Sequence, residues 1–350
     1  YFINNWDTIM IIKNISISSI SHKFITTLQT SNFTHYNRDS WIIKITTTDG
    51  LIGYGEASPI PIFNDETFDT TGYALEGFKL ALNEECDIEI DEMMILIKAH
   101  TLEVPSARFA IETAIYDILS QKKQLPLCKY LNSEALSQLS VNGLYQLTDI
   151  DNYSTIKVKC GFRNLYDEIE LLDKLSIKHG NNTKFIIDLN QAYDLPKAIR
   201  FFKEMDRFNI GYIEQPIEKN NLEDLLELSF HTNIPIALDE SINSLQSIND
   251  ALSINCGDIF IIKPQSMGSF SEIKKAVELV KNADKIPVIT SSLEGLIGRL
   301  SAMHIASANI ITNNCGLLME PIYKGEEAIA PTIKSGILDI PNKIGLGYYK

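Results

Sequence analysis

Four ionic side chains recur at nearly equal intervals in the middle of the chain. Asp188, Glu214 and Asp239 are separated by 26 and 25 residues, and Lys263 follows after a further 24. Three carboxylates brought to one place suit a hard divalent cation, because Mg²⁺ prefers oxygen ligands and keeps positions for water or substrate; Mn²⁺ is an alternative ion. A substrate carboxylate bound there becomes easier to deprotonate at its α-carbon, because the ion neutralises the developing enediolate.

Lysines could supply the base that such a reaction needs. Lys157 and Lys159 share one face of a short strand, since side chains alternate along a strand. Ile156, Val158 and Cys160 share the opposite face, which suits packing against the helices. Across a barrel, Lys159 and Lys263 would flank the substrate, and the nearby metal would depress a lysine pKa toward neutrality. Two alternatives stay open: Lys157 and Lys159 extend into solvent, or Lys263 forms a salt bridge with Asp239.

The charged residues end or follow short apolar runs that are rich in β-branched side chains and bounded by turn residues. Such runs indicate buried strands, at 156–159, 185–190, 211–216, 234–240 and 259–264. Amphipathic helical patterns lie between them, as at 198–208. One interval suits a strand, a helix and two loops, and charges at the carboxyl ends of successive parallel strands are how a (β/α) barrel builds its active site.

The residues before the barrel have a different pattern of predicted strands and helices. Residues 10–55 are β-rich with an Asp49-Gly50 hairpin turn, and 67–82 and 91–99 have helical patterns, which together predict an α+β domain. Residues 1–9 lie ahead of the strand pattern that Met10 opens, and we interpret them as an extension or a remnant outside the fold.

The barrel domain is predicted over 105–320 and the α+β domain over 10–104. A strong helix at 106–119 leads to a first barrel strand near 141–144. Further strands are expected near 287–290 and 310–311. The loop-rich segment 321–350 is expected to return to the N-terminal domain.

Composition narrows the class of partner. The formal charge of −14 argues against nucleic acid or an anionic membrane surface. No apolar run approaches the roughly 20 residues of a membrane span, and no signal-peptide pattern is seen. Five cysteines without CxxC spacing favour reduced, structural thiols and a cytoplasmic location. We therefore expect a small-molecule carboxylate as partner; the oligomeric state cannot be read from the sequence.

The motifs as a set resemble the muconate lactonizing enzyme subgroup of the enolase superfamily. The resemblance rests on residues 157–159, 188–190, 214–216, 239–241 and 263–264, with 53–57 and 108–114 as further signatures. It implies a capping domain over a (β/α)₇β modified TIM barrel. It also implies Asp188, Glu214 and Asp239 as metal ligands and Lys159 as the acid/base, a lysine-and-magnesium pairing that is general in this superfamily. Asn190 and Glu240 are expected to orient the ligands.

The resemblance is less specific for the reaction. The subgroup includes o-succinylbenzoate synthases, dipeptide epimerases, N-succinylamino acid racemases and muconate cycloisomerases. Epimerases typically carry Asp-x-Asp after the last barrel strand to hold the substrate ammonium, whereas here 312–318 contains no acid and the first is Glu320. The stretches 24–30, 55–61 and 291–294 look most like o-succinylbenzoate synthases, which suggests Thr27, Ser291 and Ser292 as substrate-binding residues. A turn or helix cap is the alternative role for the serines.

The sequence thus predicts a magnesium-dependent hydro-lyase that forms o-succinylbenzoate in menaquinone biosynthesis. Lys159 would remove the α-proton and protonate the departing hydroxyl, Lys263 would stabilise the enediolate from the opposite face, and Lys157 would tune Lys159 by like-charge repulsion. The alternatives are an N-succinylamino acid racemase or dipeptide epimerase with opposed lysine bases, and a metal-binding scaffold without turnover.

Overall fold

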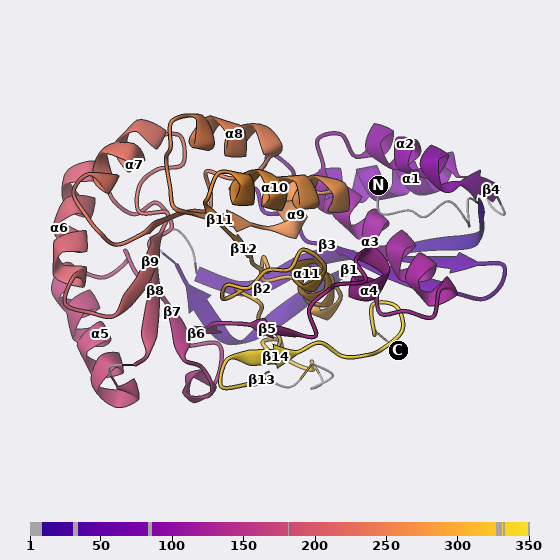
Figure 1. Cartoon of the computed structure of the whole chain (residues 1–350). Helices are drawn as coiled ribbons and strands as arrows, with labels where there is room; N and C mark the ends of the chain where they lie inside the picture. The colour runs from indigo at the N-terminus through magenta and orange to yellow at the C-terminus, as the bar shows by residue number, and fades with distance from the viewer. Residues whose placement is uncertain are drawn as a thin grey trace.

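A curled parallel sheet and a twisted antiparallel sheet form the two parts of the molecule (Figure 1). The computed structural model describes residues 9–30, 34–82, 86–180, 182–326, 331 and 333–348. Of the segment 1–9 set aside above, only Ile9 is described, and it begins the first strand. The arrangement is α/β, with an N-terminal cap next to a barrel-like sheet, as predicted.

The cap is built on an antiparallel sheet in the order β3-β2-β1-β4. Its strands are β1 (Ile9–Gln29), β2 (Thr34–Thr47), β3 (Ile52–Ala57) and β4 (Cys86–Glu89). The predicted Asp-Gly turn joins β2 to β3, where Gly50 has a φ of +87°. Two helices pack on this sheet: α1 (Phe68–Ala81), begun by a Thr67–Thr70 capping box, and α2 (Ile90–His100).

Seven parallel strands within the described residues form the curled sheet, in the order β12-β11-β10-β9-β8-β7-β6. They are β6 (Gly143–Leu144), β7 (Thr155–Lys159), β8 (Lys184–Asp188), β9 (Ile210–Glu214), β10 (Ile236–Leu238), β11 (Ile259–Ile262) and β12 (Ile286–Ile289). The helices between them lie on the outside (Figure 1): α5 (Leu165–His179), α6 (Leu195–Met205), α7 (Leu222–Ser229), α8 (Leu245–Ser253), α10 (Phe270–Asn282) and α11 (Leu296–Ala308). A 3₁₀ turn, η1 (Ile150–Asn152), and a short helix, α9 (Pro264–Met267), complete this part.

The predicted last strand near 310–311 is wrong. Ile310 has a φ of +52°, and the Ile310 and Ile311 amides donate to the carbonyls of Ser307 and Ala306, so both residues cap the end of α11. The sheet instead closes four residues later, through a bridge from Cys315 to Val141 and another from Gly316 to Thr290.

Helix α3 (Pro105–Lys122) joins the two parts and packs closely on β3. A Cβ added at Gly53 or Gly55 would lie 1.9 or 1.8 Å from the carbonyl oxygen of Ala114 or Ala110, so both glycines are required for this approach. After α4 (Leu127–Leu131), β5 (Gln138–Ser140) pairs with β14 (Ile337–Asp339), which pairs with β13 (Ile333–Lys334).

The C-terminal segment returns to α3 and β3. The Leu346 amide donates to Asp117 Oδ1 at 2.8 Å, and the ring of Tyr348 lies edge-on to Tyr54, with 5.2 Å between centroids. The division at residue 104, proposed from the sequence, stays a prediction.

Two apolar layers hold the barrel. Ile156, Val158 and Cys160 are fully buried with the helices in the main core, as their alternation predicted. A small separate cluster fills the inside of the sheet: Ile186, Tyr212, Ala237, Ile259, Ile261 and Val288. The floor beneath the strand ends is therefore packed, and the charged side chains lie above it.

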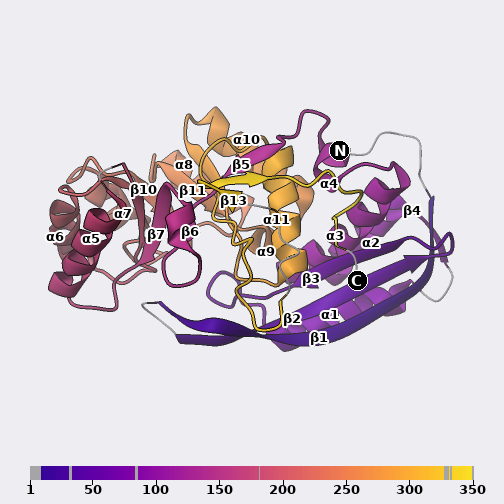
Figure 2. The ribbon, with the colours of Figure 1, turned by 90° about the horizontal axis from the view of Figure 1, so that it is seen from below.

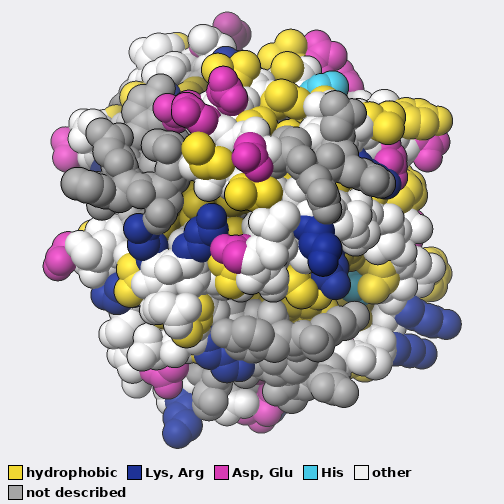
Figure 3. All heavy atoms as spheres, turned by 90° about the vertical axis from the view of Figure 1, so that its right-hand side faces the viewer, with side chains coloured by type: hydrophobic (Ala, Val, Ile, Leu, Met, Phe, Trp, Pro, Cys, Tyr) yellow, Lys and Arg dark blue, Asp and Glu magenta, His cyan; other side chains and the backbone are white. Residues whose placement is uncertain are grey.

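On the face that carries the cap, basic and acidic side chains of the described residues are interspersed with apolar ones (Figure 3). Within the described ranges, the helices are all too short or too polar to cross a bilayer. Figure 2 shows the cap sheet passing beneath α9 and α11, which places β3 against the barrel.

Candidate active site

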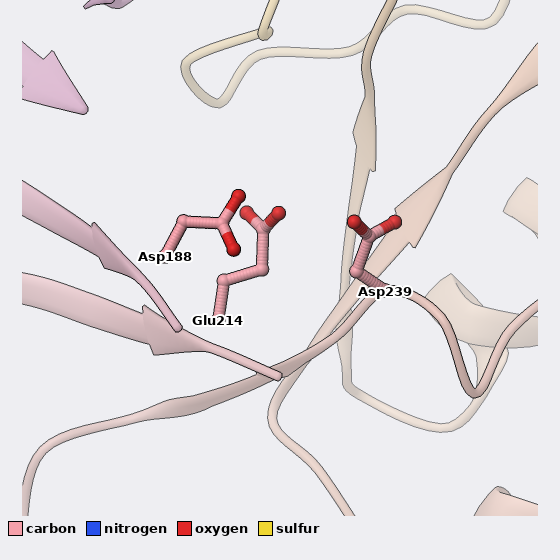
Figure 4. Close-up of side chains that lie close together, drawn as sticks. All are labelled: Asp188, Glu214 and Asp239. Carbon is pink, nitrogen blue, oxygen red and sulfur yellow. The ribbon is translucent and has the colours of Figure 1, made fainter. Parts of the chain in front are cut away.

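The strand ends bring three carboxylates into one space. Asp188 and Glu214 are the last residues of β8 and β9 and are paired in register, and Asp239 directly follows β10. All three are at most 1% exposed, and one oxygen from each lies within 4.8 Å of the others. Figure 4 shows Asp188 and Glu214 side by side, with Asp239 facing them from the next strand. The three acids selected by their spacing therefore converge.

The oxygens of this cluster are incompletely satisfied. Glu214 Oε2 and Asp239 Oδ1 are buried and have no hydrogen-bond partner among the described residues. Burial, followed by the charge of Asp188, raises the pKa of Glu214 well above its ordinary value. Isolated buried carboxylate oxygens are costly unless an ion or a proton compensates them. An all-oxygen, buried donor set with unfilled acceptors fits a hard divalent cation.

Lys157 and Lys159 meet the carboxylates and do not extend into solvent. Lys157 Nζ lies 2.6 Å from Glu214 Oε1 and 2.8 Å from Asp188 Oδ2, and Lys159 Nζ lies 2.5 Å from the same Asp188 oxygen. Their side chains are only 14% and 15% exposed. Burial disfavours the ionised form of Asp188, but both ammonium groups outweigh this cost and hold its pKa below the ordinary value.

Asn190 and Glu240 lie directly behind these groups. The Asn190 side chain accepts from Lys159 Nζ and donates to Glu240 Oε1, both at 3.0 Å, and the Asn190 backbone N–H donates to Asp188 Oδ1 at 3.1 Å. Burial, then the charges of Asp239 and Asp188, raises the pKa of Glu240 to about 7. Asn190 thus fixes the orientation of both an acid and a lysine, as a ligand-orienting residue would.

Lys263 directly follows β11, across the curled sheet from Lys157 and Lys159 on β7. Its Nζ lies 2.6 Å from Asp239 Oδ2, so the salt bridge considered above is present, and 4.1 Å from the ring centroid of Phe63. Burial opposes the charge on Lys263, but Asp239 and Glu240 outweigh it and raise its pKa. Three strands separate β11 from β7, so Lys263 and Lys159 belong to opposed positions of the curled sheet.

A cavity of about 790 Å³ opens between the barrel and the cap. All three site lysines, Asn190 and Glu240 line it, together with Ser291 and Ser292. The apolar wall comes mainly from the cap and the loops: Leu28, Ile60, Pro61, Ile62, Phe63, Leu144, Leu293 and Leu318. This mixture of an apolar wall with a few charged groups is typical of a small-molecule site.

Of the three residues predicted to bind substrate, Thr27 is the one that the structure does not bring to the cavity. Thr27 is exposed, whereas Leu28 and Thr30 line the cavity. Thr27 was selected from the resemblance of the stretch 24–30, and it lies where the β1–β2 register shifts, between Lys23 and Leu28. A local motif does not show such an irregularity.

Several lining residues were missed by reasoning from sequence. His35 and Arg38 lie on β2, and Asn142 and Thr290 lie at strand ends. Burial, then the charges of Arg38 and Lys159, lowers the pKa of His35. Arg38 donates to the carbonyls of Pro59 and Ser58 at 2.8 and 2.6 Å. The cluster of ionisable residues at 35–39 was the available signal.

The cavity wall near the last strand carries no acid among the described residues. Gly316 and Leu318 line it, whereas Glu320 turns away and accepts from the Asp149 amide and the Tyr153 hydroxyl. The region where the epimerase acid pair was expected is therefore neutral and apolar on the cavity side.

A curled parallel barrel under an antiparallel cap, with buried carboxylates between lysines at the strand ends, is the architecture of the enolase superfamily. Residues 143–349 match the family model described as enolase C-terminal domain-like, and residues 16–131 match the mandelate racemase / muconate lactonizing enzyme N-terminal domain. The chain belongs to this superfamily, and its relatives lie in the muconate lactonizing enzyme subgroup.

Relatives in this subgroup catalyse different reactions. The chain is 26% identical to the L-Ala-D/L-Glu epimerase of Bacillus subtilis, over 97% of this chain and 96% of the relative. It is 25% identical to the o-succinylbenzoate synthase of the same organism, over 96% and 93%. Among solved structures it is similar to the dipeptide epimerase from Enterococcus faecalis V583 complexed with Mg and L-Leu-L-Tyr, with a TM-score of 0.86 and 24% identity over 97% and 99%. The family and fold follow from these matches; the reaction does not.

Proposed function

We propose that the protein is an o-succinylbenzoate synthase, a hydro-lyase that removes water from 2-succinyl-6-hydroxy-2,4-cyclohexadiene-1-carboxylate. The observation that carries the proposal is the charge pattern of the cavity. Lysines at the barrel end and Arg38 at the cap end face a wall that has no acid at Gly316 and Leu318. Such a cavity suits a substrate with two carboxylates and offers no partner there for a substrate ammonium.

The metal would be held by Asp188, Glu214 and Asp239, whose buried oxygens retain unfilled acceptors. When bound, Mg²⁺ or Mn²⁺ would neutralise the negative charge that builds on the substrate carboxylate as the α-proton leaves. The three acids alone would repel that carboxylate, so we expect activity to require the ion.

Lys159 is placed to move the proton. Its Nζ is held by Asp188 and Asn190 at the barrel end of the cavity. In the neutral form it would take the α-proton, and the resulting ammonium would give a proton to the departing hydroxyl on the same face. One lysine thus serves as base and then as acid, which a syn elimination of water requires.

Lys263 would stabilise charge on the opposite face. The Asp239 carboxylate and the Phe63 ring hold its ammonium from two sides. A fixed cation next to developing negative charge lowers the barrier without a proton transfer of its own. Lys157, shared between Asp188 and Glu214, would tune Lys159 by like-charge repulsion.

A direct assay tests the proposal. The Mg²⁺-loaded enzyme should convert the cyclohexadiene carboxylate to o-succinylbenzoate, followed by the absorbance of the aromatic product, and chelation should abolish this conversion. Absence of product from the loaded, folded enzyme would rule out the dehydratase assignment.

The second candidate is an N-succinylamino acid racemase. The opposed positions of Lys159 and Lys263 favour it, because two bases on opposite faces would exchange a proton at one carbon, and this substrate also carries two carboxylates. In deuterium oxide a racemase would incorporate deuterium at the α-carbon of N-succinylamino acids. A dipeptide epimerase would do so with dipeptides, and a scaffold without turnover would act on none of these compounds.

A further inference from the structure

Glu56, at the end of β3 in the cap, has its carboxylate buried against the barrel. Glu56 Oε1 accepts from the Gly295 amide at 2.6 Å, and Oε2 accepts from the Gly298 amide at 3.0 Å. Gly295 is the N-cap residue of α11 and Gly298 lies in its first turn, where unpaired N–H groups and the helix dipole favour an anion. Burial opposes its charge, but His22 and these amides lower the pKa of Glu56, so it is ionised at neutral pH. The reaction proposed above assigns no role to this residue.

The barrel residues around Glu56 are shaped to receive it. A Cβ added at Gly295 would lie 2.7 Å from Glu56 Oε1 and 2.5 Å from His22 Nε2. At Gly298 it would lie 2.3 Å from Glu294 Cγ. A side chain at Gly295 would therefore collide with the Glu56 carboxylate, and one at Gly298 would collide with Glu294.

The segment that precedes α11 forms one wall of the cavity. It comprises residues 290–293, and the hydroxyls of Thr290 and Ser292 are buried with no hydrogen-bond partner among the described residues. The Ser292 amide donates to Glu294 Oε2. Where α11 begins thus sets where these hydroxyl groups lie, and their unfilled hydrogen bonds indicate a polar ligand.

Further contacts surround the place where Glu56 meets the start of α11. His22 Nε2 lies 3.3 Å from Glu56 Oε1, and the His22 ring stacks on Tyr323, whose hydroxyl donates to the Leu293 carbonyl. On the other side, Gln265 Nε2 donates to the Glu56 backbone carbonyl at 2.9 Å. Gln265 follows Lys263 by two residues. The end of β3 therefore contacts two barrel segments that line the cavity, one next to Lys263 and one next to residues 290–293.

From these contacts we infer that Glu56 is a positioning residue for substrate binding. Its charge holds the start of α11, and with it the Thr290–Leu293 wall, in the place where the substrate is bound, so that docking of the cap completes the binding site. The inference rests on the proposed function only in taking this cavity as the substrate site.

The test is Glu56→Gln with a matched control. The glutamine oxygen can accept one helix amide, but its NH₂ group must then face the other N–H, so one donor loses its partner. Asp117→Asn is the control, because Asp117 is also buried and accepts the amides of Tyr54 and Leu346 but does not line the cavity. Both variants should lower Tm, and only Glu56→Gln should raise KM, by about tenfold, with the Mn²⁺ affinity unchanged.

A milder variant keeps the test decisive if Glu56→Gln does not fold. His22→Phe retains the ring on Tyr323 but removes the nitrogen that faces Glu56, and should raise KM by about threefold. If the wild type turns over no substrate of the subgroup, calorimetric Kd values for o-succinylbenzoate replace KM, which separates this inference from the reaction. An unchanged KM or Kd in the folded variants, or an equal rise in Asp117→Asn, would overturn it.

Discussion

The barrel end and the cap end of the cavity differ in what holds their side chains in place. At the barrel end, Asp188 and Glu214 stand on paired strands, and both form ion pairs with Lys157 of β7. At the cap end, the 60–63 segment is held by its main chain: Lys219 Nζ donates to the Ile62 carbonyl at 2.5 Å, and Asn243 to the Phe63 carbonyl at 2.6 Å.

This difference suits the two ends to different tasks: the barrel end to catalysis and the cap end to substrate selection. Groups fixed by sheet register can hold a metal and a base within the narrow tolerances that proton transfer needs. The 60–63 segment is held through its backbone carbonyl groups, and these hydrogen bonds do not depend on the identity of its side chains. Its side chains can therefore change without loss of the bonds that position the segment. Substitutions at the barrel end should therefore reduce kcat or metal affinity, and those at the cap end should mainly alter KM.

Lys159→Ala should have the largest effect. Removing the proposed base should lower kcat by about 10³-fold or more, with KM and Mn²⁺ affinity within a few-fold of wild type, because Lys157 still contacts Asp188. Stopped-flow and steady-state assays measure this, with Lys197→Ala, an exposed lysine on α6, as control. Retained activity would show that Lys159 is not the base. It would also contradict the assignment of the chemistry to the barrel end.

The same difference explains which residues were predictable from the sequence. Asp188, Glu214 and Asp239 follow the period of the βα unit, so the pattern that predicts the strands also predicts that these side chains converge. The strand prediction at 310–311 was wrong because a short apolar pair resembles a strand. Here the pair caps α11, and where that helix ends decides between the two structures.

The cap end has no such period. His35, Arg38 and Phe63 come from a hairpin and a loop, and only the tertiary packing of the cap brings them to one wall. Thr27 was selected from the resemblance of the stretch 24–30, and it is exposed at the irregularity of the β1–β2 pairing between Lys23 and Leu28. The ionisable residues at 35–39 marked that segment, but no local pattern could show which wall it joins or where the β1–β2 register shifts.

Glu294 lies at the junction of the two ends and should make stability depend on pH. Burial raises its pKa to about 7 from an ordinary 4.5. Since the folded pKa is the higher one, the folded state keeps a proton that the unfolded chain releases, and stability falls as pH rises from 4.5 to 7. Glu294→Gln removes this cost, so its advantage over wild type in the free energy of unfolding should grow to about 3 kcal/mol at pH 8.

Urea unfolding of Glu294→Gln and wild type at pH 5 and pH 8 measures this difference. Gln can still accept from the Ser292 amide, so the wall of the cavity should be preserved and KM little changed. Equal stability differences at both pH values would show that Glu294 is ionised in the folded protein.

Metal removal tests the barrel end by itself. An ion at 100 times its Kd should raise the free energy of unfolding by about 2.7 kcal/mol. Asp239→Asn should lose most of this gain, because it removes the charge of one proposed ligand. Asp258→Asn is the matched control, a barrel acid paired with Lys285. Thermal unfolding with and without Mg²⁺ after chelation provides the measurement, and an equal gain in both variants would contradict the proposed ligand set.

Phe63→Leu should have the smallest effect, and it is the sharpest test of the comparison because Phe63 belongs to the cap end but touches a barrel lysine. Leucine retains an apolar wall but loses the ring next to Lys263 Nζ, an interaction of about 1 kcal/mol, so kcat/KM should fall about fivefold. If the ring only shapes the wall, the loss appears in KM; if it also orients Lys263, kcat falls while KM is kept. Phe230→Leu, an exposed ring outside this cavity, is the control. A loss as large as that of Lys159→Ala would show that the cap end takes part in the chemistry itself.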